Sequence, residues 1–152
     1  MKLRSLILAL LLCLLAFSFC FAQNPNMGTW KLNEARSKIP AGVGMSTTVD
    51  YSAAGNDIKI TADGMSAQGQ PSRSEWTGKF DAKPYPVVGD PDVTYRAYRT
   101  KGQRMLLFAN MKGDKTVSNG RIDVAKDGKS RTVDMTYIGS KKVHAKFVYD
   151  KQ

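Results

Sequence analysis

The sequence predicts an all-β domain: an antiparallel up-and-down meander of about 8–10 strands that closes into a β-barrel. Turn-forming residues recur at short intervals between residues 54 and 140, and the segments between them alternate apolar and polar side chains. Such alternation buries one face of each strand and exposes the other, which is typical of antiparallel sheets. After residue 22, leucine also gives way to Val, Ile, Thr, Tyr and Phe, residues that favour strands.

The individual strands follow from this alternation. We expect them at residues 28–32, 46–52, 57–62, 73–80, 85–88, 93–99, 104–111, 116–124, 131–138 and 142–150, of which 85–88 is the least regular. Residues 34–37 form the one helical or irregular candidate. A meander leaves two unpaired edges unless it closes, and eight to ten strands suffice for closure. A sandwich is the alternative, but it usually needs longer crossing connections than the single one here, residues 33–45.

The first 22 residues are typical of a secretory signal peptide. Lys2 and Arg4 precede a run without charge from residue 6 to residue 21, and Ala22 offers a small residue for cleavage. A retained membrane anchor is the alternative, but it needs about 20 apolar residues and usually charges on both flanks. Bulky Phe19 argues against lipid attachment at Cys20. We therefore expect a periplasmic or secreted protein without a stable membrane span, whose single domain comprises residues 23–152.

Both cysteines of the chain, Cys13 and Cys20, lie in the predicted signal peptide, so the domain has no disulfide and no thiolate chemistry. Two of the 23 basic and none of the 13 acidic residues fall in residues 1–22, which leaves the domain a net charge of +8. This charge favours anionic ligands or surfaces, yet the basic residues are spread along the chain and also serve solubility. Nucleic acid is not an expected partner of an exported domain of this kind.

No group of residues predicts catalysis, a cofactor or a metal. His144 is the only histidine and falls on the polar face of its strand, so it cannot form a zinc site with cysteines. Asp90 and Asp92 flank Pro91 in a turn-like sequence, and no serine lies in a Gly-x-Ser-x-Gly motif. We therefore expect a protein that is not an enzyme.

The segment Gly28–Asn33, with Gly28 and Trp30 at the start of the first strand, resembles the calycin barrels, which include lipocalins and avidin-like proteins. The resemblance implies that Trp30 is a structural plug at the closed end of the barrel, under a basic side chain from a late strand. Lys146 or Lys142 is the expected basic residue.

A closer resemblance is to the small exported lipocalin-like proteins of bacteria, over the whole predicted domain. It depends on Gly28–Asn33, Arg36–Lys38, Lys83–Asp92 and Asp127–Lys129 in this order. That group has no well-established activity. Its fatty-acid-binding relatives carry an Arg-x-Tyr pair in the last strand, whereas this strand reads Lys146 to Tyr149, so specific fatty acid capture is not implied.

The expected function is binding of a small apolar or amphipathic ligand inside the barrel. The predicted cavity wall consists of Tyr51, Trp76, Phe80, Met105, Met135, Tyr137 and Phe147. The alternative is a protein-binding, inhibitory or envelope-associated module whose barrel is filled by its own side chains. A cavity inside the barrel would distinguish the two.

Overall fold

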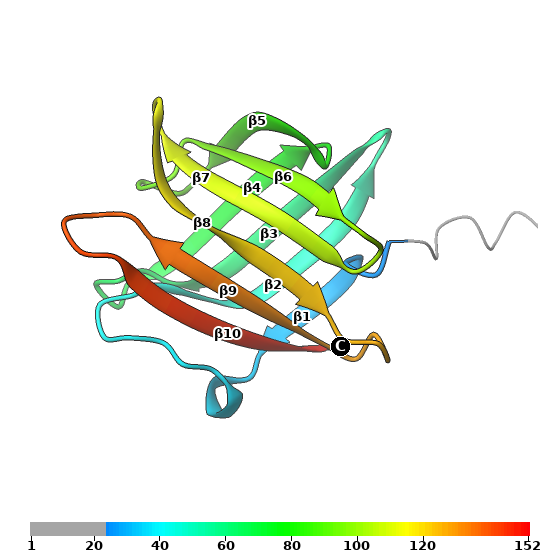
Figure 1. Ribbon diagram of the computed structural model, residues 1–152, viewed down its shortest axis with the longest axis horizontal. Helices are drawn as coiled ribbons and strands as arrows, with labels where there is room; N and C mark the ends of the chain where they lie inside the picture. The colour runs from blue at the N-terminus through cyan, green and yellow to red at the C-terminus, as the bar shows by residue number, and fades with distance from the viewer. Residues whose placement is uncertain (1–23) are drawn as a thin grey trace, which may run out of the picture.

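The computed structural model describes residues 24–152, which form ten antiparallel strands in a closed barrel (Figure 1). The predicted signal peptide lies outside the described residues. The strands are β1 (Gly28–Leu32), β2 (Met45–Ala54), β3 (Asp57–Met65), β4 (Pro71–Gly78), β5 (Asp81–Val88), β6 (Tyr95–Lys101), β7 (Met105–Lys112), β8 (Lys115–Val124), β9 (Ser130–Tyr137) and β10 (Val143–Lys151).

Every strand pairs with its neighbour in the sequence, and the first strand closes the barrel against the last. Trp30 of β1 is opposite Val49 of β2 on one side and opposite Lys151 of β10 on the other. Every strand of the barrel therefore has a neighbour on both sides, although the ladder between β4 and β5 is short. The all-β class, the meander and its closure are confirmed, and a closed barrel of this kind is consistent with a lipocalin-like fold.

The helical candidate is also confirmed, because residues Glu34–Arg36 form a 3-10 turn, η2. Asn33 caps it by accepting a hydrogen bond from the backbone N–H of Arg36 at 3.2 Å. No helix in the described part of the chain has the length and apolar character needed to cross a membrane.

Strand β5 is longer and less regular than its sequence predicted. Residues 81–84 carry turn signals, yet they form the beginning of the strand, where the register shifts between Asp81 and Pro84. Ala82 has a φ of 69°, and the Asp81 side chain accepts the N–H of Lys83 at 3.1 Å. The turn signals therefore describe a local irregularity inside the strand. Only two residue pairs join β4 to β5, since prolines at 84 and 86 cannot donate to a ladder.

The barrel has two different ends. At the closed end, residues 24–27 enter the barrel beside the turns at 55–56, 79–80, 102–104 and 125–129. At the open end lie the connections 33–44, 66–70, 89–94, 113–114 and 138–142. In Figure 1 the closed end, with the C-terminus, lies on the right, and the connections of the open end lie on the left.

Large side chains fill the half of the barrel next to the closed end. The buried residues packed together there include Trp30, Tyr51, Ile60, Trp76, Tyr98, Leu106, Phe108, Ile122, Val124, Val133, Phe147 and Tyr149. Trp76 lies edge-on against Tyr98, with ring centroids 4.9 Å apart. This half is therefore a packed core without room for a ligand.

The half next to the open end is lined by small side chains. Strand alternation directs Ala62, Gly64, Ser72, Ser74, Ser118, Gly120 and Ala145 inward. Ala62 is in register with Ser74, and Gly64 is in register with Ser72. Most of them keep part of their surface accessible, as do the inward-facing Met135 and Tyr137. A barrel widens as strands are added, and eight already suffice to hold a small ligand. The inward side chains of this half are thus small and, for the most part, not sealed from solvent.

Candidate functional site

The predicted cavity wall divides between the two halves of the barrel. Tyr51, Trp76 and Phe147 are buried among other core side chains of the closed half. Met135 and Tyr137 face the open half, and both are only partly buried. The structure thus places two of the predicted wall residues among the partly accessible inward side chains of the open half.

The remaining two predicted wall residues lie elsewhere. Phe80 is in the turn before β5, where its ring stacks on Trp76 with centroids 6.2 Å apart. Met105 lies on the outer face of β7, because its neighbours Leu106 and Phe108 are the buried ones. Met105 instead borders an open hollow of about 770 Å³ outside the barrel, between residues 24–26 and 100–106. The sequence could not show this, since β7 is apolar on both faces.

A row of four inward-facing polar residues crosses the open half, and we call it the Arg96 row. Arg96 of β6 is opposite Asn110 of β7, Asn110 is opposite Ser118 of β8, and Ser118 is opposite Tyr137 of β9. The register therefore places the four side chains in one row across four adjacent strands. Trp76 lies next to the row, because its indole N–H donates a hydrogen bond to the Arg96 carbonyl at 2.9 Å.

Hydrogen bonds fix the orientation of the Arg96 side chain. Its Nε–H donates to Oδ1 of Asn110, and Nδ2 of Asn110 donates to Oγ of Ser118 at 2.8 Å. Asn110 and Ser118 are both buried, so this chain is shielded from water. Nη1 of Arg96 lies 3.4 Å from the Tyr98 hydroxyl, a long and weak hydrogen bond.

Arg96 brings a positive charge into the barrel without a counter-ion. A guanidinium stays protonated at all ordinary pH values. None of the eight ion pairs found among residues 24–152 involves Arg96. Asp90, an acid of the open end, already accepts the backbone N–H groups of Asp92 and Val93 at 2.9 and 3.2 Å.

The ionisation of Tyr137 reflects the same surroundings. Burial raises the pKa of the Tyr137 hydroxyl, the negative charge of Asp90 raises it further, and the positive charge of Arg96 opposes both. Tyr137 is therefore a neutral hydroxyl that shares its surroundings with a cation. It makes no hydrogen bond to another described side chain, so it can donate to a bound molecule.

The closed end holds a second interior cation, which corrects the prediction of Lys146 or Lys142. Trp30 is fully buried, and its indole N–H donates to the Asn26 carbonyl at 2.8 Å. The basic group over its ring is Arg131 of β9, whose guanidinium carbon lies 4.7 Å from the ring centroid. Lys151 adds a second cation at 5.2 Å. Lys146 and Lys142 are exposed, since Lys146 points outward between buried Ala145 and Phe147.

Arg131 is enclosed by aromatic rings from three strands. Besides Trp30, its guanidinium carbon lies 4.6 Å from the Tyr51 ring and 5.2 Å from the Tyr149 ring. Only 2% of the residue is exposed, and its Nε and Nη1 atoms have no hydrogen-bond partner among the described residues. Its charge is therefore stabilised by the ring faces. A sequence signal existed, because Arg131 stands two residues before inward-facing Val133.

The acidic and histidine candidates lie outside the barrel interior. His144 is exposed on β10, and its Nδ1 is 2.9 Å from the Thr136 hydroxyl of β9. Asp90 holds the turn that its sequence predicted, through the two backbone N–H groups described above. Among residues 24–152, no three His, Cys, Asp or Glu side chains are grouped so as to hold a metal ion.

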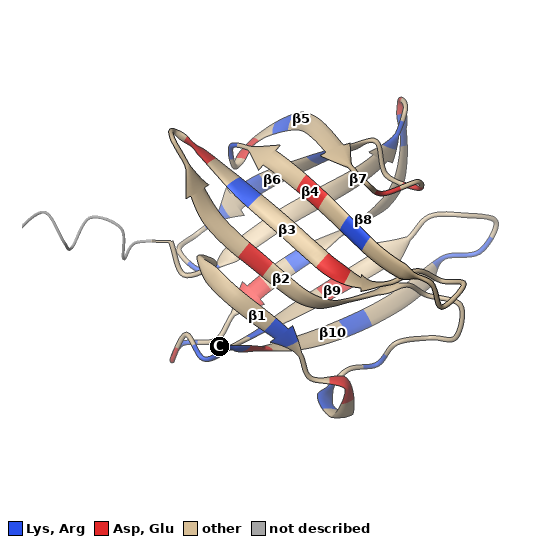
Figure 2. Cartoon of the chain, turned by 180° about the vertical axis from the view of Figure 1, so that it is seen from behind, with Lys and Arg blue, Asp and Glu red and all other residues tan. Residues whose placement is uncertain are grey.

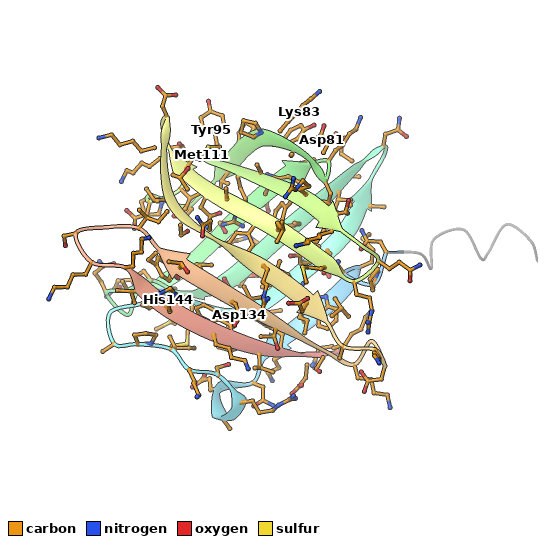
Figure 3. The ribbon with its side chains drawn as sticks, viewed as in Figure 1. Asp81, Lys83, Tyr95, Met111, Asp134 and His144 are labelled. Atoms are coloured by element: carbon orange, nitrogen blue, oxygen red, sulfur yellow. The ribbon has the colours of Figure 1, made fainter. Side chains whose placement is uncertain are left out.

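The outer face of β7 is apolar and borders a second feature of the surface. Met105, Leu107, Ala109 and Met111 alternate with the buried side chains of this strand, and Tyr95 of β6 lies opposite Met111 (Figure 3). We call these five residues the outer apolar strip. Beside it, an open hollow of about 820 Å³ crosses the outer face of β7–β10, lined among others by Leu107, Asn119, Arg121, Asp134 and His144.

Charged side chains are distributed around the whole barrel. Figure 2 shows lysines and arginines on several strands and connections, interspersed with acidic residues. Many are paired: Arg121, for example, contacts Asp123 and Asp134 at 3.2 and 3.1 Å. In this view the basic side chains of residues 24–152 therefore form no single face, in keeping with the spread of charge along the sequence.

The fold and the Arg96 row together define a closed ten-stranded antiparallel barrel with one packed half and one accessible half. Comparison with known proteins narrows this class no further, because neither a family model nor a curated protein matches the chain.

Proposed function

We propose that the protein is a non-enzymatic, exported β-barrel that binds a small apolar or amphipathic molecule through its open end. The observation that carries the proposal is the contrast between the two halves of the interior. Large side chains fill the closed half, whereas small and partly accessible side chains line the open half. A pocket that combines apolar walls with a few polar groups is the usual form of a small-molecule site.

The residues of the open half suit a molecule with an apolar body and one polar group. Met135 offers a flexible apolar surface that adapts to ligand shape. The Arg96 row supplies the polar groups on four adjacent strands of the wall. Export is part of the proposal because residues 1–22 have the composition of a signal peptide.

Native mass spectrometry of the protein, purified gently from the cells that produce it, tests the proposal. We expect an additional mass that disappears on denaturation and after extraction with organic solvent. A bare protein mass, still bare after incubation with mixed envelope lipids, would contradict binding of a small apolar molecule.

A matched pair of variants locates the site. Ala62 faces the open half, and Ala97 lies on the outer face of β6. Ala62→Phe should fill the open half and remove the additional mass, while Ala97→Phe should leave it in place. Thermal unfolding of both variants checks that they remain folded. Retention of the mass by folded Ala62→Phe would place the ligand outside the open half.

The outer apolar strip supports a second candidate, a protein-binding module. Four apolar side chains of one strand face solvent there without cover from another described element. Under this alternative, Leu107→Lys should abolish a complex that migrates above the monomer in an extract of the producing cells. Asn119→Lys, at an exposed position on the neighbouring strand, is the control. Loss of the complex in neither variant would argue against the strip as its interface.

A further inference from the structure

We infer that the molecule bound in the open half carries an anionic group, a carboxylate or a phosphate, which the Arg96 guanidinium holds. This inference rests on the proposed function above, because it names the chemical class of that ligand. It starts from a comparison of the two arginines that the barrel encloses.

The two interior arginines differ in how the protein stabilises their charge. Arg131 lies within 5.2 Å of three aromatic ring centroids, which account for a cation in that position. Arg96 has a single ring near it, that of Tyr98, at 6.0 Å from the centroid. Removing a charge from water is costly unless another group compensates for it. Within residues 24–152, the compensation at Arg96 is incomplete.

The other groups around Arg96 do not provide that compensation. Asn110 is neutral and holds only the Nε edge of the guanidinium. Tyr98 offers only its hydroxyl to Arg96, and burial raises the pKa of the Tyr137 hydroxyl, which keeps that group uncharged. Asp90 contributes a negative charge but forms no ion pair with Arg96, and its Oδ1 atom accepts two backbone N–H groups of its own turn. A carboxylate that pairs with Arg96 directly would therefore have to come from outside the described chain.

The hydrogen bonds of Arg96 leave the side suited to an anion available. Since Nε is held by Asn110, the only hydrogen bond of the Nη1 and Nη2 edge within residues 24–152 is the 3.4 Å contact of Nη1 with the Tyr98 hydroxyl. This edge offers two parallel N–H donors, the arrangement that binds carboxylates and phosphates in a bidentate manner. The Tyr137 hydroxyl belongs to the same row, responds to the charge of Arg96 and offers a further donor.

The guanidinium lies at the boundary between the two halves of the barrel. The next inward row toward the closed end consists of Tyr98, Phe108, Gly120, Met135 and Ala145, and core side chains fill the space below it. An anionic head group at Arg96 would thus sit at the bottom of the accessible half. The apolar body would extend past the small side chains toward the open end.

Three ten-carbon probes test the inference: decanoate, decyl phosphate and decanol. Their affinities are measured at neutral pH by isothermal titration calorimetry on the delipidated protein. We expect at least one of the two anions to bind about tenfold more tightly than decanol, the ratio that one charge-assisted hydrogen-bonded pair provides. Which anion is preferred distinguishes a carboxylate from a phosphate ligand.

Variants assign the preference to Arg96. Arg96→Gln should reduce the affinity for the anion to that for decanol, whereas Arg99→Gln, on the outer face of the same strand, should not change it. Asn110→Asp gives a second route, since it places a carboxylate against Arg96 at nearly constant volume. It should abolish the anion preference even if Arg96→Gln fails to fold.

The outcomes separate this inference from the proposed function. Equal binding of decanol and both anions would overturn the anionic ligand and leave the proposed function in place. A preference for anions that persists in folded Arg96→Gln or Asn110→Asp would overturn the role of Arg96. Failure of all three probes to bind the delipidated protein, together with a bare native mass, would overturn the proposed function itself.

Discussion

The Tyr149 hydroxyl, at the closed end of the barrel, makes the stability of the folded protein depend on pH in the alkaline range. Tyr149 is 5% exposed, and its hydroxyl donates to the Ser46 carbonyl at 3.0 Å. Burial raises the pKa of this hydroxyl to about 12 from its usual value of 10.0, although the nearby charge of Arg131 opposes the shift. We predict that Tyr149→Phe changes from destabilising to neutral, and then to stabilising, as the pH rises.

The direction follows from the two states of the chain. In the unfolded chain Tyr149 loses its proton near pH 10, whereas in the folded barrel it keeps the proton until about pH 12. Its contribution to folding is therefore complete below pH 10 and is lost between pH 10 and pH 12. At about 1.4 kcal/mol per pH unit, the wild-type protein loses roughly 1.4 kcal/mol by pH 11 through this group.

The hydrogen bond from Tyr149 to the Ser46 carbonyl acts in the opposite direction, because its loss destabilises the variant. Phenylalanine keeps the ring over Arg131 but loses the bond to Ser46, which costs about 1 kcal/mol at pH 8. The variant has no hydroxyl to ionise, so its deficit should vanish near pH 11 and reverse above it. Buried Tyr51, whose pKa burial also raises, is present in both proteins and cancels in the comparison.

Urea unfolding at pH 8, 10 and 11 measures the difference in the free energy of unfolding. Tyr95→Phe is the control, because Tyr95 is 42% exposed and its substitution should give the same small effect at each pH. A deficit of Tyr149→Phe that stays constant from pH 8 to pH 11 would refute the argument, since it would mean that the folded barrel does not protect the hydroxyl.

Three further predictions concern stability, each measured as a shift in the unfolding midpoint. Gly120→Ala would bring a methyl group against the Asp134 carbonyl and the Phe108 ring, so it should cost about 1–3 kcal/mol; an unchanged midpoint would contradict this close approach. Arg131→Ala should cost at least about 3 kcal/mol, because it empties the space among three rings; a loss under about 1 kcal/mol would show that the guanidinium contributes little. Ala82→Gly should stabilise the protein by roughly 0.5–1 kcal/mol, since glycine relieves the strain at a φ of 69° but makes the unfolded chain more flexible; a lower midpoint would refute it.

The strands could be predicted because the alternation of apolar and polar residues within each strand shows which of its faces is buried. Alternation places Val133, Met135 and Tyr137 on one face without knowledge of any other strand, and β9 lies within a residue of its expected bounds. Strand β5 was harder, because Pro84 and Pro86 weaken its ladder and turn residues stand at its start.

The interior polar groups could not be predicted in the same way. Alternation puts Arg131 on the same inward face as Val133. A charged side chain is nevertheless not expected to be buried unless the three aromatic rings that surround it are known. Those rings come from β1, β2 and β10, which meet only when the barrel closes. The Arg96 row likewise depends on the register of four strands. Alternation alone puts Arg96 and Tyr98 on one face of their strand, whereas their neighbours across the barrel depend on the closed sheet.

The pairing of β1 with β10 has a consequence for the order in which the protein folds. Every other pairing joins neighbouring strands, so hairpins such as β7–β8 can form as soon as their own residues are available. The seam between Trp30 and Lys151 joins the two ends of the described chain and carries the largest entropic cost of loop closure. Rapid local steps should therefore precede a slow final closure. Until that closure the chain remains an open sheet whose two edge strands have unpaired backbone N–H and C=O groups, and such a sheet is prone to self-association.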